Sequence, residues 1–419
     1  MSRAIKISTT IFFIIVSSVL QWCSLPIGNT FVWWVIYTWC LYCLFSLKPP
    51  KYNVWCITAF LALVGVSAVY GALIQAENYW DWKNLIKNLF IFLLPIAAIS
   101  FSSPKTLSVA LNKYFKYLPV LFLLLCFFFE SDAFGRMLVP YSIMAIFIPC
   151  IKKHNLIPIA IAFAITLVFG FRSRSDVIKF LFCIVLGLSL FLYKYRFILV
   201  KLYRALHIIL LSIPFVLAAL AATGVFNIFM LDEVLGTDGK YTMSDDNYAS
   251  GEASVLADTR TFIYEEEITS AINHNYIIQG RSIARGYDSA FFGNEMDEDM
   301  KTNRGERYES EVAIMNIFNH FGAIGVLLYF TIFIMASYKA LYKSGNVFIK
   351  AVGVFVAFKW TFSWIEDFQR MDLNNLFLWI MIGMCFSPLF RSMTNKQFVR
   401  WIRSIRILPI PKKKIVTKK

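Results

Sequence analysis

The residues of this sequence best suited to chemistry are arginines at places where a membrane protein seldom carries them. The five that stand out, in the connection 170–176 and in the polar stretch 232–311, are Arg172, Arg174, Arg260, Arg281 and Arg285. A guanidinium group stays charged at any relevant pH and binds phosphate oxygens through two parallel hydrogen bonds. For any one arginine, pairing with a nearby acid is the stronger explanation. For Arg174, Arg260 and Arg281 together we predict an anion site at the membrane boundary, a depth at which a lipid pyrophosphate would place two phosphates.

Two lysines add to this pattern because they fall inside otherwise apolar segments. Lys179 lies one helical turn beyond the connection 170–176, and Lys359 lies just before the polar connection 364–370. Ionisable residues within membrane segments are costly, and they mark functional sites or buried ion pairs. Together with the arginines, they predict that charge converges on one face of the protein.

Two carboxylates stand where the polar stretch ends and the next apolar segment begins. Glu309 and Glu311 lie just before a segment that starts near residue 312. We expect the low dielectric of this boundary to raise a carboxylate pKa, which suits a general base for a hydroxyl group. A pair of solvated loop-end residues explains the two glutamates equally well. Tyr287 is the aromatic candidate in this stretch, although aromatic residues are common at membrane boundaries for other reasons.

The sequence shows no metal-binding or phosphate-loop pattern. All eight cysteines lie in or beside apolar segments, and none is in 232–311, so we predict neither a disulfide framework nor a thiolate zinc site. The acidic run 297–299 resembles a cation site only loosely, and a solvated surface run explains it better. We therefore predict chemistry without a metal or a cofactor.

These residues must be positioned by a polytopic membrane protein. The chain is 58% hydrophobic and only 16% charged, which is far from the composition of a soluble domain. Backbone groups in lipid must be bonded internally, so the apolar segments are helices and the fold class is all-α. We predict about twelve transmembrane helices, at approximately 8–25, 30–47, 53–75, 85–101, 117–129, 137–151, 155–171, 177–193, 206–230, 312–336, 346–363 and 373–390.

The distribution of charge predicts the topology. With both termini and the even-numbered connections in the cytoplasm, that side carries 26 lysines and arginines and the outer side carries 13. All 26 acidic residues then fall outside, 18 of them in residues 232–311. The predicted organisation is nine helices in 1–231, a large periplasmic loop in 232–311, three helices in 312–391 and a basic cytoplasmic tail in 392–419. The tail would lie beside anionic membrane lipids, and nucleic acid is not expected as a partner.

The large loop has its own pattern. From Asp258, a plausible N-cap, the apolar residues Tyr264, Ile268 and Ile272 recur every four positions, which predicts an amphipathic helix with Arg260 in its first turn. The stretch 275–287 follows, and its glycines allow tight backbone turns. The loop is therefore expected to hold its arginines on ordered elements.

At this point the sequence resembles the O-antigen polymerase/O-antigen ligase superfamily over about residues 165–335. Ser173-Arg174-Ser175 is similar to the short Ser-Arg-small connection of that family. The stretch from Arg260 to Gly280, followed by Gly286, resembles its arginine-led helix and glycine turn, without the usual proline. Phe321-Gly322-Ala323-Ile324-Gly325 matches the glycine-containing helix that follows the loop.

The resemblance implies a function. Members are integral membrane enzymes that use glycans linked to undecaprenyl pyrophosphate, so it implies a glycan polymerase in the bacterial inner membrane, with a chain-length regulator as a further partner. Ligases of this family carry a His-Asn pair where this chain has Glu309-Ser310, which favours the polymerase. A substrate of this kind would let Tyr287 stack on a sugar ring. A ligase, and a lipid-glycan flippase or transporter without bond chemistry, are the alternatives.

Overall fold

The computed structural model describes residues 2–20, 30–47, 52–169, 174–227, 229, 242–244, 252–254, 260–290, 293 and 304–408. Within them, six helical runs are long and apolar enough to cross a membrane by length and composition. Three shorter apolar helical stretches add to these: Thr30–Ser46, Lys153–Phe169 and Leu373–Phe386. The chain is therefore an all-α membrane protein, as the sequence predicts, while the exact number of twelve spans stays a prediction.

Except on either side of α13, the helices follow one another with short connections. They are α1 (Arg3–Leu20), α2 (Thr30–Ser46), α3 (Trp55–Tyr70), η1 (Gly71–Gln75), α4 (Tyr79–Leu93), α5 (Ile96–Ser100), α6 (Pro104–Leu125), η2 (Cys126–Phe128), α7 (Ser131–Met137), α8 (Val139–Ala145), η3 (Ile148–Cys150), η4 (Lys153–Asn155), α9 (Leu156–Phe169), α10 (Arg174–Ser189), η5 (Leu190–Tyr195), α11 (Arg196–Ala222), α13 (Arg260–Asn273), α15 (Ala313–Tyr342), α16 (Val347–Phe362), α17 (Leu373–Phe386), α18 (Pro388–Arg391) and α19 (Asn395–Ser404).

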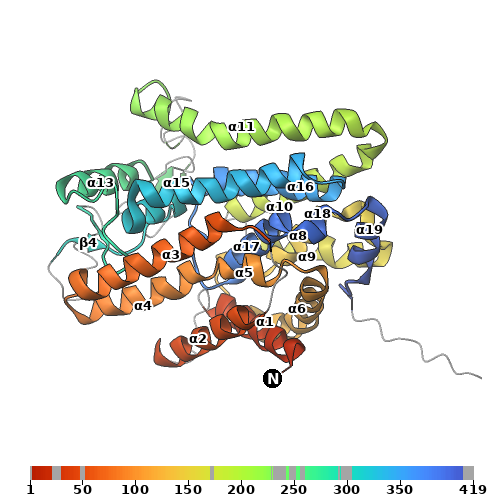
Figure 1. Ribbon diagram of the computed structural model, residues 1–419, viewed down its shortest axis with the longest axis horizontal. Helices are drawn as coiled ribbons and strands as arrows, with labels where there is room; N and C mark the ends of the chain where they lie inside the picture. The colour runs from red at the N-terminus through yellow and green to blue at the C-terminus, as the bar shows by residue number, and fades with distance from the viewer. Residues whose placement is uncertain are drawn as a thin grey trace, which may run out of the picture.

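Five long helices, α3, α4, α11, α15 and α16, run along the longest axis of the molecule (Figure 1). Their apolar side chains supply both the core and an exposed apolar surface, as expected of helices that meet lipid. α16 and α17 are the most enclosed: every residue of α17 is buried. The centre of the bundle thus lies in the C-terminal third of the chain.

Several expected spans differ from the observed helices. The segment predicted at 206–230 is α11, which covers Arg196–Ala222, and the segment predicted at 85–101 is divided between α4 and α5. The segment predicted at 117–129 belongs to α6, which begins already at Pro104. The segment predicted at 137–151 is not one helix but a broken chain of α7, α8 and η3. Prolines at the first turns of α8 and η3 account for the breaks, because proline cannot donate the backbone hydrogen bond that a continuous helix needs.

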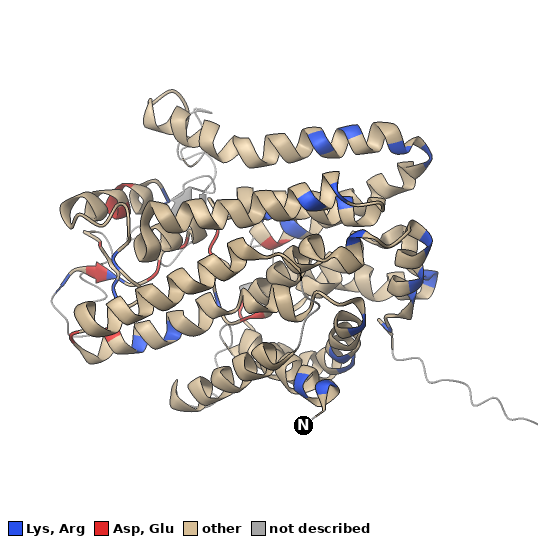
Figure 2. Ribbon diagram, in the orientation of Figure 1, with Lys and Arg blue, Asp and Glu red and all other residues tan. Residues whose placement is uncertain are grey.

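Charge is separated along the bundle. Figure 2 shows acidic residues gathered around α13, β4 and the first turns of α4, and lysines and arginines gathered around α19, the first half of α11 and the first turn of α16. We call these two regions the acidic end and the basic end. This is the separation expected of a membrane protein whose two faces meet different compartments.

The large loop contributes a helix and two short antiparallel strand pairs. The predicted helix is present as α13, while its proposed N-cap, Asp258, lies outside the described residues. The face that it buries differs from the predicted one: Ile268 and Ile272 are exposed, and the buried residues are Ile263, Glu267, Ser270 and Ala271. β1 (Thr242–Ser244) pairs with β2 (Glu252–Ser254), and β3 (Tyr287–Asp288) pairs with β4 (Glu306–Arg307). α13, β3 and β4 all lie at the acidic end (Figure 1).

Candidate functional site

The turn after α13 is built into a break in helix α15. Gly322, inside α15, has φ 62° and ψ −162°, so the helical hydrogen-bond ladder is interrupted there. The backbone of the loop fills the gap: Ala323 and Ile324 donate from their backbone nitrogens to the carbonyls of Ile277 (2.8 Å) and Ile278 (3.2 Å). A loop segment thus takes the place of the missing helical turn and is fixed to the bundle.

The same segment is held by polar side chains of the neighbouring helices. On α4, Asn88 donates to the carbonyl of Ile283 at 3.0 Å, and on α3, Ser67 accepts from the backbone nitrogen of Ile283 at 3.2 Å. His320 of α15 is fully buried, with Nδ1 3.0 Å from the carbonyl of Ser282. Buried backbone groups that are satisfied in this way keep the segment in one conformation.

A cluster of buried charges has members from three parts of the chain: α7, α10 and the connection 363–372. Lys179 of α10 binds Asp176 at 2.5 Å and Glu366 at 2.8 Å. Arg136 of α7 lies 3.5 Å from Asp372 and 3.9 Å from Glu366. All five side chains are buried. Burying charge is tolerated only where the partners are close, so these elements are locked in one relative position.

The connection 363–372 between α16 and α17 is the centre of this arrangement. It contacts α13 through Tyr264, whose hydroxyl donates to the carbonyl of Trp364 at 2.7 Å. It contacts α15 through Gln369, which donates to the carbonyl of Ala313 at 3.0 Å. Because Glu366 binds α10, one short connection positions the elements that carry Arg174 and Arg260.

Burial and neighbouring cations shift the pKa values of the acids in this connection in opposite directions. Burial by itself would raise the pKa of Glu366, but Lys179 and its other cationic neighbours hold that pKa well below its ordinary value. Burial raises the pKa of Asp367, and Arg370, 3.6 Å away, offsets this only in part. Glu366 is therefore the anchor of the ion cluster, and Asp367 is the neighbour that protonates more readily.

Glu309 is half-buried and makes an ion pair of 2.5 Å with Lys87 of α4. Burial favours its neutral form, yet Lys87 and Arg370 hold the pKa of Glu309 below its ordinary value. The expectation of a raised pKa at this position is therefore wrong, because the lysine next to the carboxylate outweighs the low dielectric. Glu311 is more exposed and lies 3.2 Å from Arg307, and both glutamates precede the first turn of α15, as predicted.

The predicted arginines divide into two groups. Arg281 is buried and binds Asp288 at 2.9 Å and Glu306 at 3.0 Å, while the Nε of Arg285 donates to Glu306 at 3.0 Å. By contrast, Arg174 is exposed at the first residue of α10, and Arg260 is partly exposed at the first residue of α13. Arg172 lies outside the described residues.

Tyr287 is fully buried in β3, and Arg307 donates to its hydroxyl at 3.4 Å. Its ring has no exposed face on which a sugar could stack, so its position is that of a core residue. A second buried group in the same region is Glu267 of α13, whose two carboxylate oxygens have no hydrogen-bond partner among the described residues. Burial raises the pKa of Glu267 well above its ordinary value.

Several members of the site were not predicted from the sequence. They are Arg136, Asp176 and Asp372 in the buried cluster, Lys87 beside Glu309, and Glu267 in α13. A signal exists for Arg136 and Lys87, because both are single charges at the edge of an apolar segment. The described residues hold no group of three His, Cys, Asp or Glu side chains placed to bind a metal ion.

No protein-family model and no curated protein matches this sequence.

Proposed function

We propose that this protein is a polysaccharide polymerase that acts on glycans linked to a lipid pyrophosphate at its acidic end. The observation that carries the proposal is the contact between Gly280 and Gly322. These two residues belong to separate motifs of the family that the sequence resembles, and they meet where the loop is built into α15. The loop is thereby held beside the membrane helices, where a lipid-linked substrate would arrive.

In the proposed reaction, a hydroxyl oxygen of the acceptor sugar attacks the anomeric carbon of the donor glycan. The bond between this carbon and the pyrophosphate oxygen breaks, and the lipid pyrophosphate leaves with the electron pair. Arg174 and Arg260, the exposed and partly exposed arginines, would neutralise the charge that develops on the leaving group. Arg281 and Arg285 would hold the loop in place, because both are engaged with Glu306.

Glu309 is the proposed acceptor of the hydroxyl proton. Its lowered pKa keeps it ionised at neutral pH, so the form that accepts a proton is the one present. The half-buried position keeps the carboxylate accessible, with Lys87 fixing its orientation. Glu311, on the other side of Ser310, is the alternative base.

The test is a deletion strain complemented with the intact gene or with variants. Loss of polymerisation should leave a single repeat unit on the surface in place of a ladder of chain lengths. Complete absence of surface glycan would support the flippase alternative instead. Accumulation of full-length polymer on its lipid carrier would support the ligase alternative.

The proposal also requires that the acidic end face the periplasm and that both termini face the cytoplasm of a bacterial inner membrane. A cysteine introduced at Ser244, in the large loop, should react with an impermeant maleimide in intact spheroplasts. A cysteine introduced at Ser404, exposed at the end of α19, should react only after lysis. The reverse pattern would overturn the orientation and the proposed site with it.

A further inference from the structure

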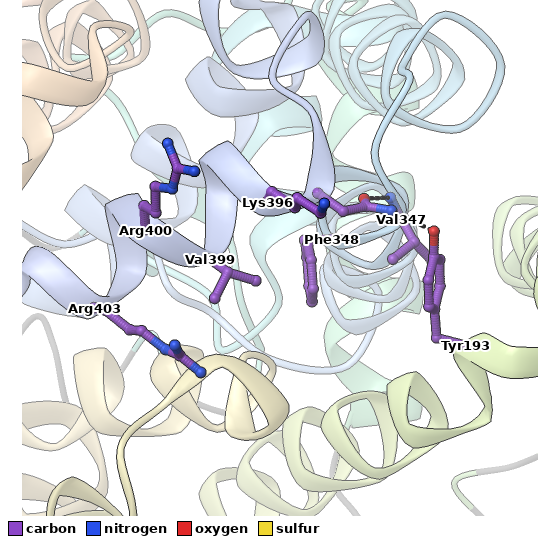
Figure 3. A pocket seen from close by; sticks show the side chains of 8 residues that line it. Tyr193, Val347, Phe348, Lys396, Val399, Arg400 and Arg403 are labelled. Atoms are coloured by element: carbon purple, nitrogen blue, oxygen red, sulfur yellow. Dashed lines mark hydrogen bonds between the residues drawn. The ribbon is translucent and has the colours of Figure 1, made fainter.

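The basic end contains a hollow that the proposed polymerase function does not use. Its volume is about 370 Å³, within the range of sites for small molecules. It lies between α19, the first residues of α16 and η5, and its main lining residues are Tyr193, Val347, Phe348, Lys396, Arg400 and Arg403. Figure 3 shows the three basic side chains along α19, with Val399 and Phe348 between them and Tyr193 on the facing element.

The three cations share one side of α19 because they are spaced at i, i+4 and i+7. All three are exposed, and none of them forms an ion pair with a described residue. Among the residues that the structure describes, Figure 2 shows no acidic residue beside α19. Like charges at this spacing repel each other, so a helix that carries them is favoured where an anion from outside the protein lies between them.

α19 is held in place by other residues. Phe398 and Ile402 are buried, and Phe398 stacks on Phe348 with ring centroids 5.2 Å apart and planes at 9°. Asn395 accepts from the backbone nitrogen of Val347 at 3.0 Å and donates to the hydroxyl of Tyr193 at 2.7 Å. The hollow is thus a fixed feature of the fold. Of the three basic side chains, Arg403 adds to this packing, because its Nε donates to the carbonyl of Cys150 at 3.2 Å.

The lining combines positive charge with apolar surface. Lys396, Arg400 and Arg403 would meet a phosphate, and Val347 and Phe348 would meet hydrocarbon. We infer that the hollow binds an anionic phospholipid of the surrounding leaflet, with the phosphate on α19 and the start of an acyl chain against α16. This site does not rest on the proposed polymerase function, because it uses the opposite end of the molecule.

The test uses the full-length protein, purified in a neutral detergent and titrated with dioleoylphosphatidylglycerol, while retained lipid is measured by native mass spectrometry. The binding variant carries Lys396→Gln, Arg400→Gln and Arg403→Gln. The matched control carries Lys105→Gln, Lys116→Gln and Lys201→Gln, which remove the same charge from exposed positions outside the hollow. At about fivefold per basic residue, the binding variant should bind roughly 100-fold more weakly, and the control should bind like the unchanged protein.

A second variant tests whether binding depends on the shape of the hollow and not on positive charge alone. Val399→Trp keeps every basic residue but fills the space between them, so it should also weaken binding. Dioleoylphosphatidylcholine and inorganic phosphate should not compete at equal concentration. Three results would each overturn the inference. The two triple variants could lose the same affinity for the lipid, Val399→Trp could bind the lipid as tightly as the unchanged protein, or either probe could compete as well as dioleoylphosphatidylglycerol itself.

Discussion

The backbones of Gly280 and Gly322 lie so close that neither position has room for a side chain. A Cβ atom added to Gly322 would lie 2.5 Å from the backbone nitrogen of Gly280, and one added to Gly280 would lie 2.6 Å from that of Gly322. Both residues also have positive φ, 77° and 62°, a region that other residues enter only at a cost. The pair joins the large loop to the membrane bundle.

Replacing either glycine should therefore loosen this junction. Gly280→Ala and Gly322→Ala should each lower the free energy of unfolding by about 2 kcal/mol or more, from backbone strain and overlap together. The measurement is thermal unfolding in detergent. Gly65→Ala is the matched control, because a Cβ there meets no atom within 4 Å, and it should be neutral or slightly stabilising. Unchanged unfolding of both glycine variants would mean that the loop is not fixed in α15.

The buried ion cluster should be sensitive to the loss of one partner. Lys179→Met leaves Asp176 and Glu366 without their closest cation, and we expect a loss of about 3–5 kcal/mol in the free energy of unfolding. Lys116→Met, at an exposed position in α6, should change stability by less than about 0.5 kcal/mol. If both variants unfold alike, the cluster does not hold the helices together.

The pH dependence of polymerisation tests the role of Glu309. Lys87 holds the pKa of Glu309 down, so the base stays ionised to lower pH. Lys87→Met should raise that pKa and move the acidic limb of the pH–rate profile to higher pH, while Lys83→Met, one turn earlier on α4, should not. Glu309→Gln should lower the rate by about 10²–10⁴-fold. Normal ladders from Glu309→Gln together with an inactive Glu311→Gln would transfer the role to Glu311.

Substitutions in the two groups of arginines should have different effects. Arg174→Ala and Arg260→Ala should abolish the ladder at normal protein levels, because both act on the substrate. Arg281→Ala and Arg285→Ala should instead lower protein level and stability, because Glu306 is buried and loses a cation in each case. A stable but inactive Arg281→Ala would place that arginine on the pyrophosphate.

Glu267 should make the protein less stable as the pH rises. Its pKa is raised by burial, so the folded state binds a proton that the unfolded state gives up above the ordinary carboxylate pKa of about 4.5. The stability that depends on this proton is complete below that value and declines as the pH rises toward the folded-state pKa. Glu267→Gln should unfold at a higher temperature than the unchanged protein at pH 8 and at a similar temperature at pH 4.5. Glu265→Gln, at an exposed position, should follow the unchanged protein throughout.

The sequence by itself determined the class of protein and the separation of acidic from basic residues along the molecule. Long apolar segments can only be helices in lipid, and the placement of acids and bases along them already predicted the charged ends that Figure 2 shows. The sequence also predicted α13, from the spacing of Tyr264, Ile268 and Ile272, and the start of α15 after Glu311. These features depend on neighbours in the chain, so local periodicity is enough to find them.

Only the tertiary structure decided which charges meet. Lys87 and Glu309 are separated by more than two hundred residues, yet they form an ion pair that reverses the expected direction of the carboxylate's pKa. From the sequence, Arg281 is as good a candidate for a phosphate ligand as Arg174. In the fold, Arg281 has two carboxylate partners, whereas Arg174 is exposed. Helical spacing shows which residues share a face of one helix. It does not show which faces pack together, and that packing sets the charge and burial of each candidate residue.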